Sequence, residues 1–571
     1  MPKLKIWLVI FFLIISVPRV FALKTHLTPE RILVVVNTKS PKSKRVAAFY
    51  QKARQIPAEN MLYLPMPTRE EITRPFYLKF IETPIRKFLE KKAWQDKILV
   101  ILLMPDVPHK IAGKVAKNGD AASVDSELTL LYRKMLFGPY RKDGWLPNPY
   151  FQSPIDEPFE HDRYDIYLVT RIDGYTEKDS LALIKRATAA KKTHPPYTLV
   201  LDAKDGPARP GDNWLHAAYL LLKDFPGLKI EASFNRAFLV SGERVIGYAS
   251  WGSNDPNYPK DRKLYFKFLP GAIGVTFVST SARTFIEPPR HWQVNRGRKY
   301  FFQGSPQSLI GDLVRLGITG ISGNAYEPYL SACARPHLLF PAYIKGKTLA
   351  EAYYRSLAYL SWQTVVLGDP LASIGPREVE RPPLENWFVK RKEAYQEAKK
   401  SKDYLLLAKI EMHLGWPEKA LKYLKKLKEE KETLPPQAYY LLLAMARQKD
   451  FERRVIDFLK YDSNENAKIV EAFIYIKHKR YAWAEKVLLE TPLKTPDALF
   501  LLGKVKLALK DCESAVNLIE KAIALKPNAW GFYPDLYRAL KACGQKERAE
   551  KIKTKLLQMP SLAELWPELK N

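Results

Sequence analysis

The sequence predicts two unlike parts: an α/β domain with a mostly parallel sheet between helical layers, and after it an all-α solenoid of helical repeats. Three observations predict this arrangement. Between residues 31 and 373, short runs rich in β-branched residues alternate with helical stretches. Several of these runs are continuously apolar, which is typical of strands covered on both faces. Beyond Pro376 the strand pattern stops, and a helical pattern recurs every 30 to 34 residues.

The chain opens with the pattern of a secretory signal. Lys3 and Lys5 precede an apolar run over residues 6–17, and the run is followed by residues that suit cleavage by a signal peptidase after Ala22. The run is short for a bilayer span, and no later apolar stretch has membrane length. We therefore expect residues 1–22 to be a signal peptide, with an uncleaved anchor as the alternative. The mature chain is then exported to the periplasm or the extracellular space and has no transmembrane span.

The α/β domain is expected over residues 29–376. The predicted strands are residues 32–36, 97–103, 166–170, 198–201, 244–248, 272–278, 317–322 and 364–367. The predicted helices are residues 43–55, 76–93, 177–192, 213–223, 306–316 and 348–358. Strands that alternate with helices in this way indicate a parallel sheet.

A linker helix is expected over residues 377–400, followed by about five repeats over residues 401–560. The clearest repeat carries Leu502-Gly503, Ala515, Ala522 and Pro527, where small residues let paired helices approach and proline ends the unit. This part resembles a tetratricopeptide array, and the resemblance implies that it binds a partner protein. A helical bundle without repeats is the alternative.

Charge and cysteine content narrow the classes of function. The 92 Lys and Arg residues exceed the 61 Asp and Glu residues, which gives a net charge of +31. The excess is spread over both parts, which favours a solvated lysine-rich surface and no binding of nucleic acid. Three cysteines do not make a disulfide framework. We expect Cys512 and Cys543 to be unpaired and buried, with a bridge between neighbouring repeats as the alternative.

No motif predicts a cofactor or a metal. The sequence lacks GxxxxGK[ST], a GxGxxG between strand and helix, and HExxH, and its nine histidines are scattered.

Polar side chains follow three of the predicted strands. Trp251, Ser253, Asn254 and Asp255 come after the strand that ends near Tyr248. The loops after the next two strands carry further candidates, namely Thr280, Ser281, Arg283 and Glu327. Because ligands bind at the carboxyl edge of such sheets, these loops predict a pocket. Hydrogen-bonded structural turns explain the same composition and are the alternative.

Three segments stand out at or near the ends of predicted strands: Tyr248-Ala249-Ser250-Trp251-Gly252-Ser253, Phe277-Val278-Ser279-Thr280 and Val366-Leu367-Gly368-Asp369-Pro370-Leu371. With these segments in this order, residues 240–375 resemble the gingipain and caspase-like cysteine peptidases. In that family, one strand ends with the catalytic histidine and the next with the catalytic cysteine. Here Trp251 stands at the histidine position, and Thr280 or a neighbouring serine stands at the cysteine position. With the segment at residues 122–127, the domain also resembles an exported bacterial family of unassigned function.

The resemblance implies a three-layer caspase-like fold without the peptidase dyad. A thiolate attack needs a thiol and a base within hydrogen-bond reach, and tryptophan offers only an N–H donor. Cys333 is expected on a helix away from these strand ends, and Asp369 is expected to have a structural role in a turn.

Three functional interpretations remain open. The first is a non-peptidase domain that binds a peptide, a glycan or a small ligand through the loop residues, with Asp125 and Glu127 added to the site. The second is a hydrolase with a rebuilt site, in which a Ser or Thr is the nucleophile and Asp125, Glu127, Asp255 or Glu327 act as acid and base. The third is a purely structural envelope scaffold.

Overall fold

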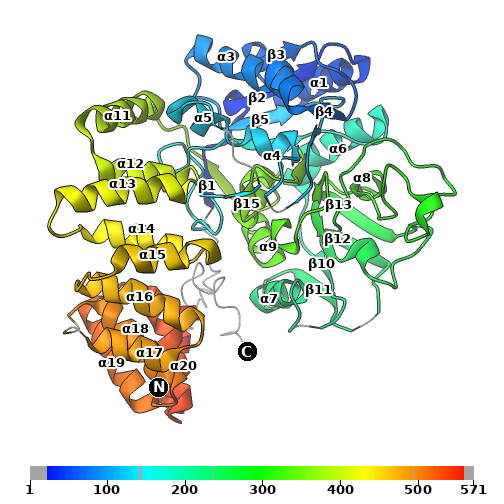
Figure 1. Cartoon of the computed structure of the whole chain (residues 1–571). Coiled ribbons are helices and arrows are strands. Elements are labelled where there is room, and N and C mark those ends of the chain that lie inside the picture. The colour runs from blue at the N-terminus through cyan, green and yellow to red at the C-terminus, as the bar shows by residue number, and fades with distance from the viewer. Residues whose placement is uncertain are drawn as a thin grey trace, which may run out of the picture.

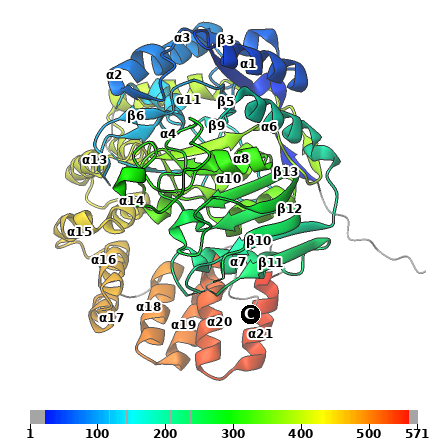
Figure 2. The same cartoon turned by 90° about the vertical axis from the view of Figure 1, so that its right-hand side faces the viewer.

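The structure is a computed structural model that describes residues 22–557, except residues 117, 141–143, 207, 236, 491 and 493. The expected signal peptide lies outside the described residues apart from Ala22. Figure 1 shows an α/β part in blue to green beside a stack of helices in yellow to red. Figure 2 shows that this stack curves beneath the α/β part. Among the described residues, no helix has both the length and the apolar character needed to cross a membrane.

A ten-stranded sheet forms the centre of the α/β part. Neighbours are parallel from β11 to β14 and from β9 to β3, whereas β16 is antiparallel to β14 and joins β9 through the single pair Leu367–Arg171. From edge to edge the strands are β11 (Leu228–Ser233), β10 (Tyr197–Asp202), β12 (Ser241–Ser250), β13 (Tyr265–Thr276), β14 (Gly320–Asn324), β16 (Thr364–Gly368), β9 (Leu168–Arg171), β5 (Val100–Leu103), β2 (Ile32–Asn37) and β3 (Met61–Leu64).

The strands β12, β13 and β14 are adjacent and parallel, as the sequence predicts. Ser250 pairs with Thr276 near the carboxyl ends of β12 and β13, and Val275 pairs with Ser322 on β14. The loops that follow these strands therefore start from the same edge of the sheet.

Continuous apolar runs do mark strands that are buried on both faces. In β2, Val34 and Val36 belong to one hydrophobic core, while Leu33 and Val35 belong to a second core. All of the residues of β2 are buried. Since successive side chains point to opposite faces of a strand, both faces of the sheet are covered here.

Helices provide this cover. In one group, α6 packs against both α1 and α8, and in another, α9 packs against both α7 and α10. The helices of the α/β part are α1 (Pro41–Arg54), α2 (Arg74–Tyr77), α3 (Thr83–Lys92), α4 (Val124–Leu128), α5 (Leu131–Phe137), α6 (Glu177–Ala189), α7 (Asp212–Leu222), α8 (Ile310–Leu316), α9 (Pro336–Ile344) and α10 (Leu349–Ser356).

Three small sheets complete the α/β part. The first joins the two ends of the domain, because β1 (Leu23–Thr25) pairs in parallel with β17 (Arg377–Val379). The second pairs β8 (Leu146–Pro147) with β15 (Tyr359–Leu360). The third contains β4 (Glu71–Thr73), β6 (Lys110–Ala112) and β7 (Ala122–Ser123).

The C-terminal part is an array of helix pairs. In the described residues there are five pairs: α12 (Tyr404–His413) with α13 (Pro417–Glu430), α14 (Pro436–Ala446) with α15 (Glu452–Leu459), α16 (Glu465–Lys477) with α17 (Tyr481–Leu489), α18 (Pro496–Ala508) with α19 (Cys512–Leu525), and α20 (Tyr533–Ala542) with α21 (Lys546–Leu557). A Cβ atom on Gly503 of α18 would lie 2.7 Å from Ile519 Cγ1 of α19. The small residue is thus needed for close helix packing, as the repeat pattern predicts.

A disulfide joins the last two repeats. Cys512, at the start of α19, is bonded to Cys543, at the end of α20, and their Cα atoms are 5.6 Å apart. The expectation of two buried, unpaired thiols was wrong. The two residues start and end helices that pack together, so their side chains meet although 31 positions separate them.

The helix α11 (Trp387–Ser401) packs into the α/β part and is more than a linker. Phe388 is buried in the same core as Tyr132, and Tyr395 contacts Phe137 edge to face at 5.1 Å between ring centroids. Next to it, His413 of the first repeat lies 2.6 Å from the Asp165 carboxylate. The repeats are therefore attached to the α/β part by both apolar contacts and hydrogen bonds.

Candidate functional site

The loops after β12 and β13 lie against each other and against residues 295–308. Ser308 N donates to Ser253 Oγ at 2.8 Å, and Asn295 Nδ2 donates to the Ser253 carbonyl at 2.7 Å. Asn254 Nδ2 donates to the carbonyl of Phe277, at 2.7 Å. Two of the predicted site residues thus hold neighbouring loops in place.

The next group of predicted residues bonds in the same way. Gln307 connects the two loops, because its Nε2 donates to Asn254 Oδ1 at 3.0 Å and its Oε1 accepts from Thr280 Oγ1 at 2.7 Å. Arg283 donates to three backbone carbonyls, those of Phe302, Thr280 and Ser305, at 3.0–3.2 Å. Burial lowers the pKa of this guanidinium to about 10. The hydrogen bonds of these side chains are made to other groups of the protein, which is typical of residues that hold loops in place. We call these bonded loops the structural layer.

Trp251 contacts an acidic group that the sequence analysis did not select. Its Nε1 donates to Asp212 Oδ1 at 2.6 Å. Asp202, at the end of β10, is 1% exposed, and its Oδ2 has no hydrogen-bond partner among the described residues. Burial, reinforced by the charges of Asp255 and Asp212, raises the pKa of Asp202 to about 8. Asp202 therefore holds a proton at neutral pH.

Asp125, Glu127 and Glu327 do not join this group. Asp125 is fully buried, and Arg171 donates to its carboxylate at 2.6 Å. Glu127 is held by Lys134 at 2.8 Å and by Arg74 at 3.2 Å. Burial alone would raise the pKa of Glu127, but these two cations lower it to about 2. Glu327 is exposed. We had expected these carboxylates in the pocket, and two of them instead form buried ion pairs between distant elements.

Cys333 lies closer to the strand ends than expected. It follows a short 3₁₀ turn, before α9, and its Sγ is 3.9 Å from Nδ2 of Asn324 on β14. The expectation of a helical cysteine far from the strand ends was therefore wrong. The thiol is buried, and burial raises its pKa to about 12. It remains protonated at neutral pH and cannot act as a thiolate nucleophile.

A cavity of about 710 Å³ opens beside this layer, at the carboxyl ends of β5 and β9. Phe285 reaches it from the loop after β13 and donates its N–H to Glu70 Oε1 at 2.6 Å, while its ring contacts that of His109 at 5.1 Å. On the facing side, Lys42 Nζ lies 3.2 Å from Asp173 Oδ1. Burial raises the pKa of Glu70. The cavity is lined by carboxylates, by the cations Lys42, Arg69 and Lys110, and by aromatic rings that include Tyr175 and Phe285, which suits a polar ligand with an apolar side.

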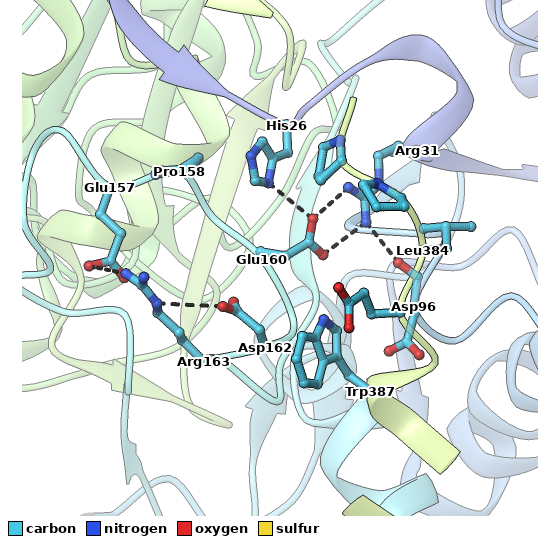
Figure 3. Close-up of a pocket in the computed structure, with 13 residues that line it drawn as sticks. His26, Arg31, Asp96, Glu157, Pro158, Glu160, Asp162, Arg163, Leu384 and Trp387 are labelled. Atoms are coloured by element: carbon cyan, nitrogen blue, oxygen red, sulfur yellow. Dashed lines mark hydrogen bonds and ion pairs between the residues drawn. The ribbon is translucent and has the colours of Figure 1, made fainter. Parts of the chain in front are cut away.

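A smaller cavity of about 180 Å³ lies where the N-terminal strand, residues 157–163 and the segment before α11 meet. Figure 3 shows Glu160 between His26 and Arg31, with Arg163 between Glu157 and Asp162. Arg31 donates to both oxygens of Glu160, at 2.6 and 2.9 Å. Both of its arginines are paired with carboxylates, Arg31 with Glu160 and Arg163 with Glu157, so we describe this cavity as part of the joint between the two ends of the α/β domain.

The repeats carry a third cavity, of about 250 Å³, which we call the aromatic groove. Tyr440 on α14 is 57% exposed at this groove, and Arg447 comes directly after the last residue of that helix. Phe500 and Phe532 stack with 4.1 Å between centroids. The first helices of successive pairs line it, with residues Pro436, Tyr439, Tyr440, Leu443, Arg447, Asn466, Ile469, Val470, Phe473, Asp497, Phe500, Leu501 and Phe532.

Comparisons with known proteins concern the C-terminal helical part. MamA from Desulfovibrio magneticus RS-1 is 25% identical over 28% of this chain and 94% of that chain, with a TM-score of 0.23. A tetratricopeptide repeat protein from Parabacteroides merdae is 15% identical over 32% of this chain and 78% of that chain, with a TM-score of 0.25. The tetratricopeptide-like repeats of a putative kinesin light chain from Podosopora anserina are 17% identical over 28% of this chain and 93% of that chain, with a TM-score of 0.20.

No family model matches the sequence, and no curated protein matches it. Within the described part of the chain, no cluster of three or more His, Cys, Asp or Glu side chains could hold a metal ion.

Sequence reasoning missed Glu70, Asp173 and Asp202. Asp202 and Asp173 could have been found from the sequence, because each lies at or just after the end of an apolar strand. Asp255 was selected on the same ground. Glu70 could not have been found, since it lies between two short strands that the sequence does not mark.

Proposed function

We propose that this chain is an exported, non-peptidase binding protein, in which the repeat array holds an extended segment of a partner protein in the aromatic groove. The observation that carries this proposal is the row of aromatic side chains that lines the groove along the first helices of successive repeats, in which Tyr440 is exposed and Phe473 and Phe500 are half-buried. Stacked helix pairs form extended binding surfaces, and exposed tyrosines in apolar surroundings are typical anchors of protein interfaces.

For the α/β part we propose a caspase- and gingipain-like domain without its dyad. Support comes from the adjacent parallel strands β12 and β13, whose following loops carry Trp251 and Thr280 at the two positions that the resemblance compares with the peptidase dyad. We place its ligand, a peptide or glycan end or another small polar molecule, in the cavity at Glu70, Asp173 and Phe285.

The alternatives have less support. A rebuilt hydrolase needs a free carboxylate beside a free hydroxyl, whereas Asp125 and Glu127 are ion-paired and Thr280 bonds to Gln307. A scaffold role accounts for the bonded loops but leaves the aromatic groove without a purpose. Export is supported by the signal pattern and by the Cys512–Cys543 bridge, since disulfides persist in oxidising compartments.

The proposal is tested by selecting peptides that bind the mature chain from a displayed random library, and by measuring their affinity for two variants. Tyr440→Ala should weaken binding at least tenfold, because it removes an exposed groove anchor. Trp483→Ala is the matched control, since Trp483 is 56% exposed but lies on α17, outside the groove lining. If every selected peptide is indifferent to Tyr440→Ala, the groove is not the binding site.

A further inference from the structure

The last described residues of the chain lie next to one end of the aromatic groove. Leu556 of α21 is fully buried and packs in one cluster with Tyr533 and Trp530. Phe532, which precedes Tyr533, lines the groove and stacks on Phe500. The chain therefore continues beyond Leu557 from a point close to the groove.

The segment that follows, residues 558–571, has a sequence suited to this surface. It is rich in apolar residues, namely Met559, Leu562, Leu565, Trp566 and Leu569, while Pro560 and Pro567 disfavour a continuous helix and so favour an extended form. Fourteen residues reach roughly 20 Å as a helix or up to about 45 Å when extended, which is ample for a groove spanning neighbouring repeats.

Charge adds a second match. The segment carries Glu564 and Glu568 between its apolar residues. Arg447 lines the groove, and Lys504 lies 5.5 Å from the Phe500 ring centroid. Pairing of these glutamates with Arg447 and Lys504 would favour binding and set its orientation, with Lys570 of the segment available to Asp497 of the groove lining.

We propose that residues 558–571 of the chain bind in its own aromatic groove and compete there with the partner segment. The inference rests on the proposed function of the groove. A segment attached beside its site has an effective concentration in the millimolar range, so even a weak intrinsic affinity keeps the groove occupied. A partner then has to displace this segment, which limits binding to sequences with higher affinity.

The test uses a labelled synthetic peptide of residues 558–571 and two forms of the full mature chain. One form is wild type, and the other carries Leu565→Asp and Trp566→Asp. The peptide should bind the double variant at least tenfold more tightly than it binds the wild type, because the attached segment no longer competes. Adding Tyr440→Ala to the double variant should reverse this gain, whereas adding Trp483→Ala should not.

Equal affinity of the peptide for the wild type and the double variant would overturn the inference, as would no binding to either. The library-selected peptides separate this failure from failure of the groove itself, because they should still bind and still respond to Tyr440→Ala. Sedimentation of both forms gives a further check. If the wild type is a dimer and the double variant is a monomer, the segment binds a second copy, and the intramolecular proposal is wrong.

Discussion

Breaking the Cys512–Cys543 bridge is expected to destabilise the last two repeats by about 3.7 kcal/mol. The bridge closes a loop of 31 residues, and the loop-closure entropy that it removes from the unfolded chain corresponds to this free energy at 25 °C. The Cα separation of 5.6 Å is within the normal range for disulfides, so the fold accepts the bridge without backbone movement. The effect should be local, because each repeat contacts mainly its neighbours.

Hydrogen exchange of the full chain in increasing urea, read by mass spectrometry over residues 496–557, measures this effect. Reduction should lower the urea midpoint of these residues and leave the α/β part unchanged. The double variant Cys512→Ser/Cys543→Ser is the control, since it should match the reduced protein and ignore reductant. Buried Cys333, whose thiol has a pKa raised to about 12, should stay unreactive throughout. Equal midpoints for the oxidised and reduced protein would refute the reasoning.

Three further predictions concern buried carboxylates. Asp369→Ala should lower the free energy of unfolding by about 4 kcal/mol, and the melting temperature of the α/β part by roughly 5 °C, because Arg54, 2.6 Å from the carboxylate, loses its ionic partner. Calorimetry measures the melting temperature, and an unchanged value would contradict a structural role for Asp369. Asp202→Asn should stabilise the fold by up to about 4 kcal/mol at pH 7 and by little at pH 4, because the pKa of Asp202 is raised to about 8 and the stability of the wild type therefore falls as pH rises from about 4 to 8. Urea titrations of both proteins at the two pH values test this, and an equal effect of the substitution at both would count against it. Glu127→Gln should lower the free energy of unfolding by about 3 kcal/mol above pH 4.5, and this loss should vanish as pH falls toward 2, since Lys134 beside Glu127 lowers its pKa in the folded protein to about 2. The difference in urea midpoint between the variant and the wild type should therefore shrink between pH 7 and pH 3, and a constant difference would rule this out.

Central strands could be predicted from the sequence, and edge strands could not. The run at residues 32–36 is apolar throughout because β2 lies between two cores. The two edge strands, β3 and β11, were missed. In β11, Lys229 and Glu231 are only partly buried or exposed, so the run does not differ from a loop in its hydrophobicity.

The sequence predicted which strand ends lie side by side, but not how the side chains of the following loops bond or that the cavity lies beside them. The parallel pairing of β12 with β13 starts the loops that carry Trp251 and Thr280 from the same edge of the sheet, as the strand pattern predicts. The strand pattern could not show that Gln307, from a loop far along the chain, uses the hydrogen bonds of Thr280. Nor could it show that Arg171, 46 positions away, pairs with Asp125. Such pairings depend on contacts between distant elements, for which local sequence carries no signal.

The pairing of β1 with β17 affects the order in which the α/β domain can fold. Leu23 is the first of the described residues to pair in a sheet, and its partner is Arg377, beyond every strand of the main sheet. During synthesis, β1 has no strand to pair with until almost the whole domain has been made. Closing so long a loop is slow relative to forming helices and neighbouring strands. The N-terminal strand is thus among the last to be fixed, and the chain just after the predicted cleavage site stays unpaired while the rest of the domain assembles.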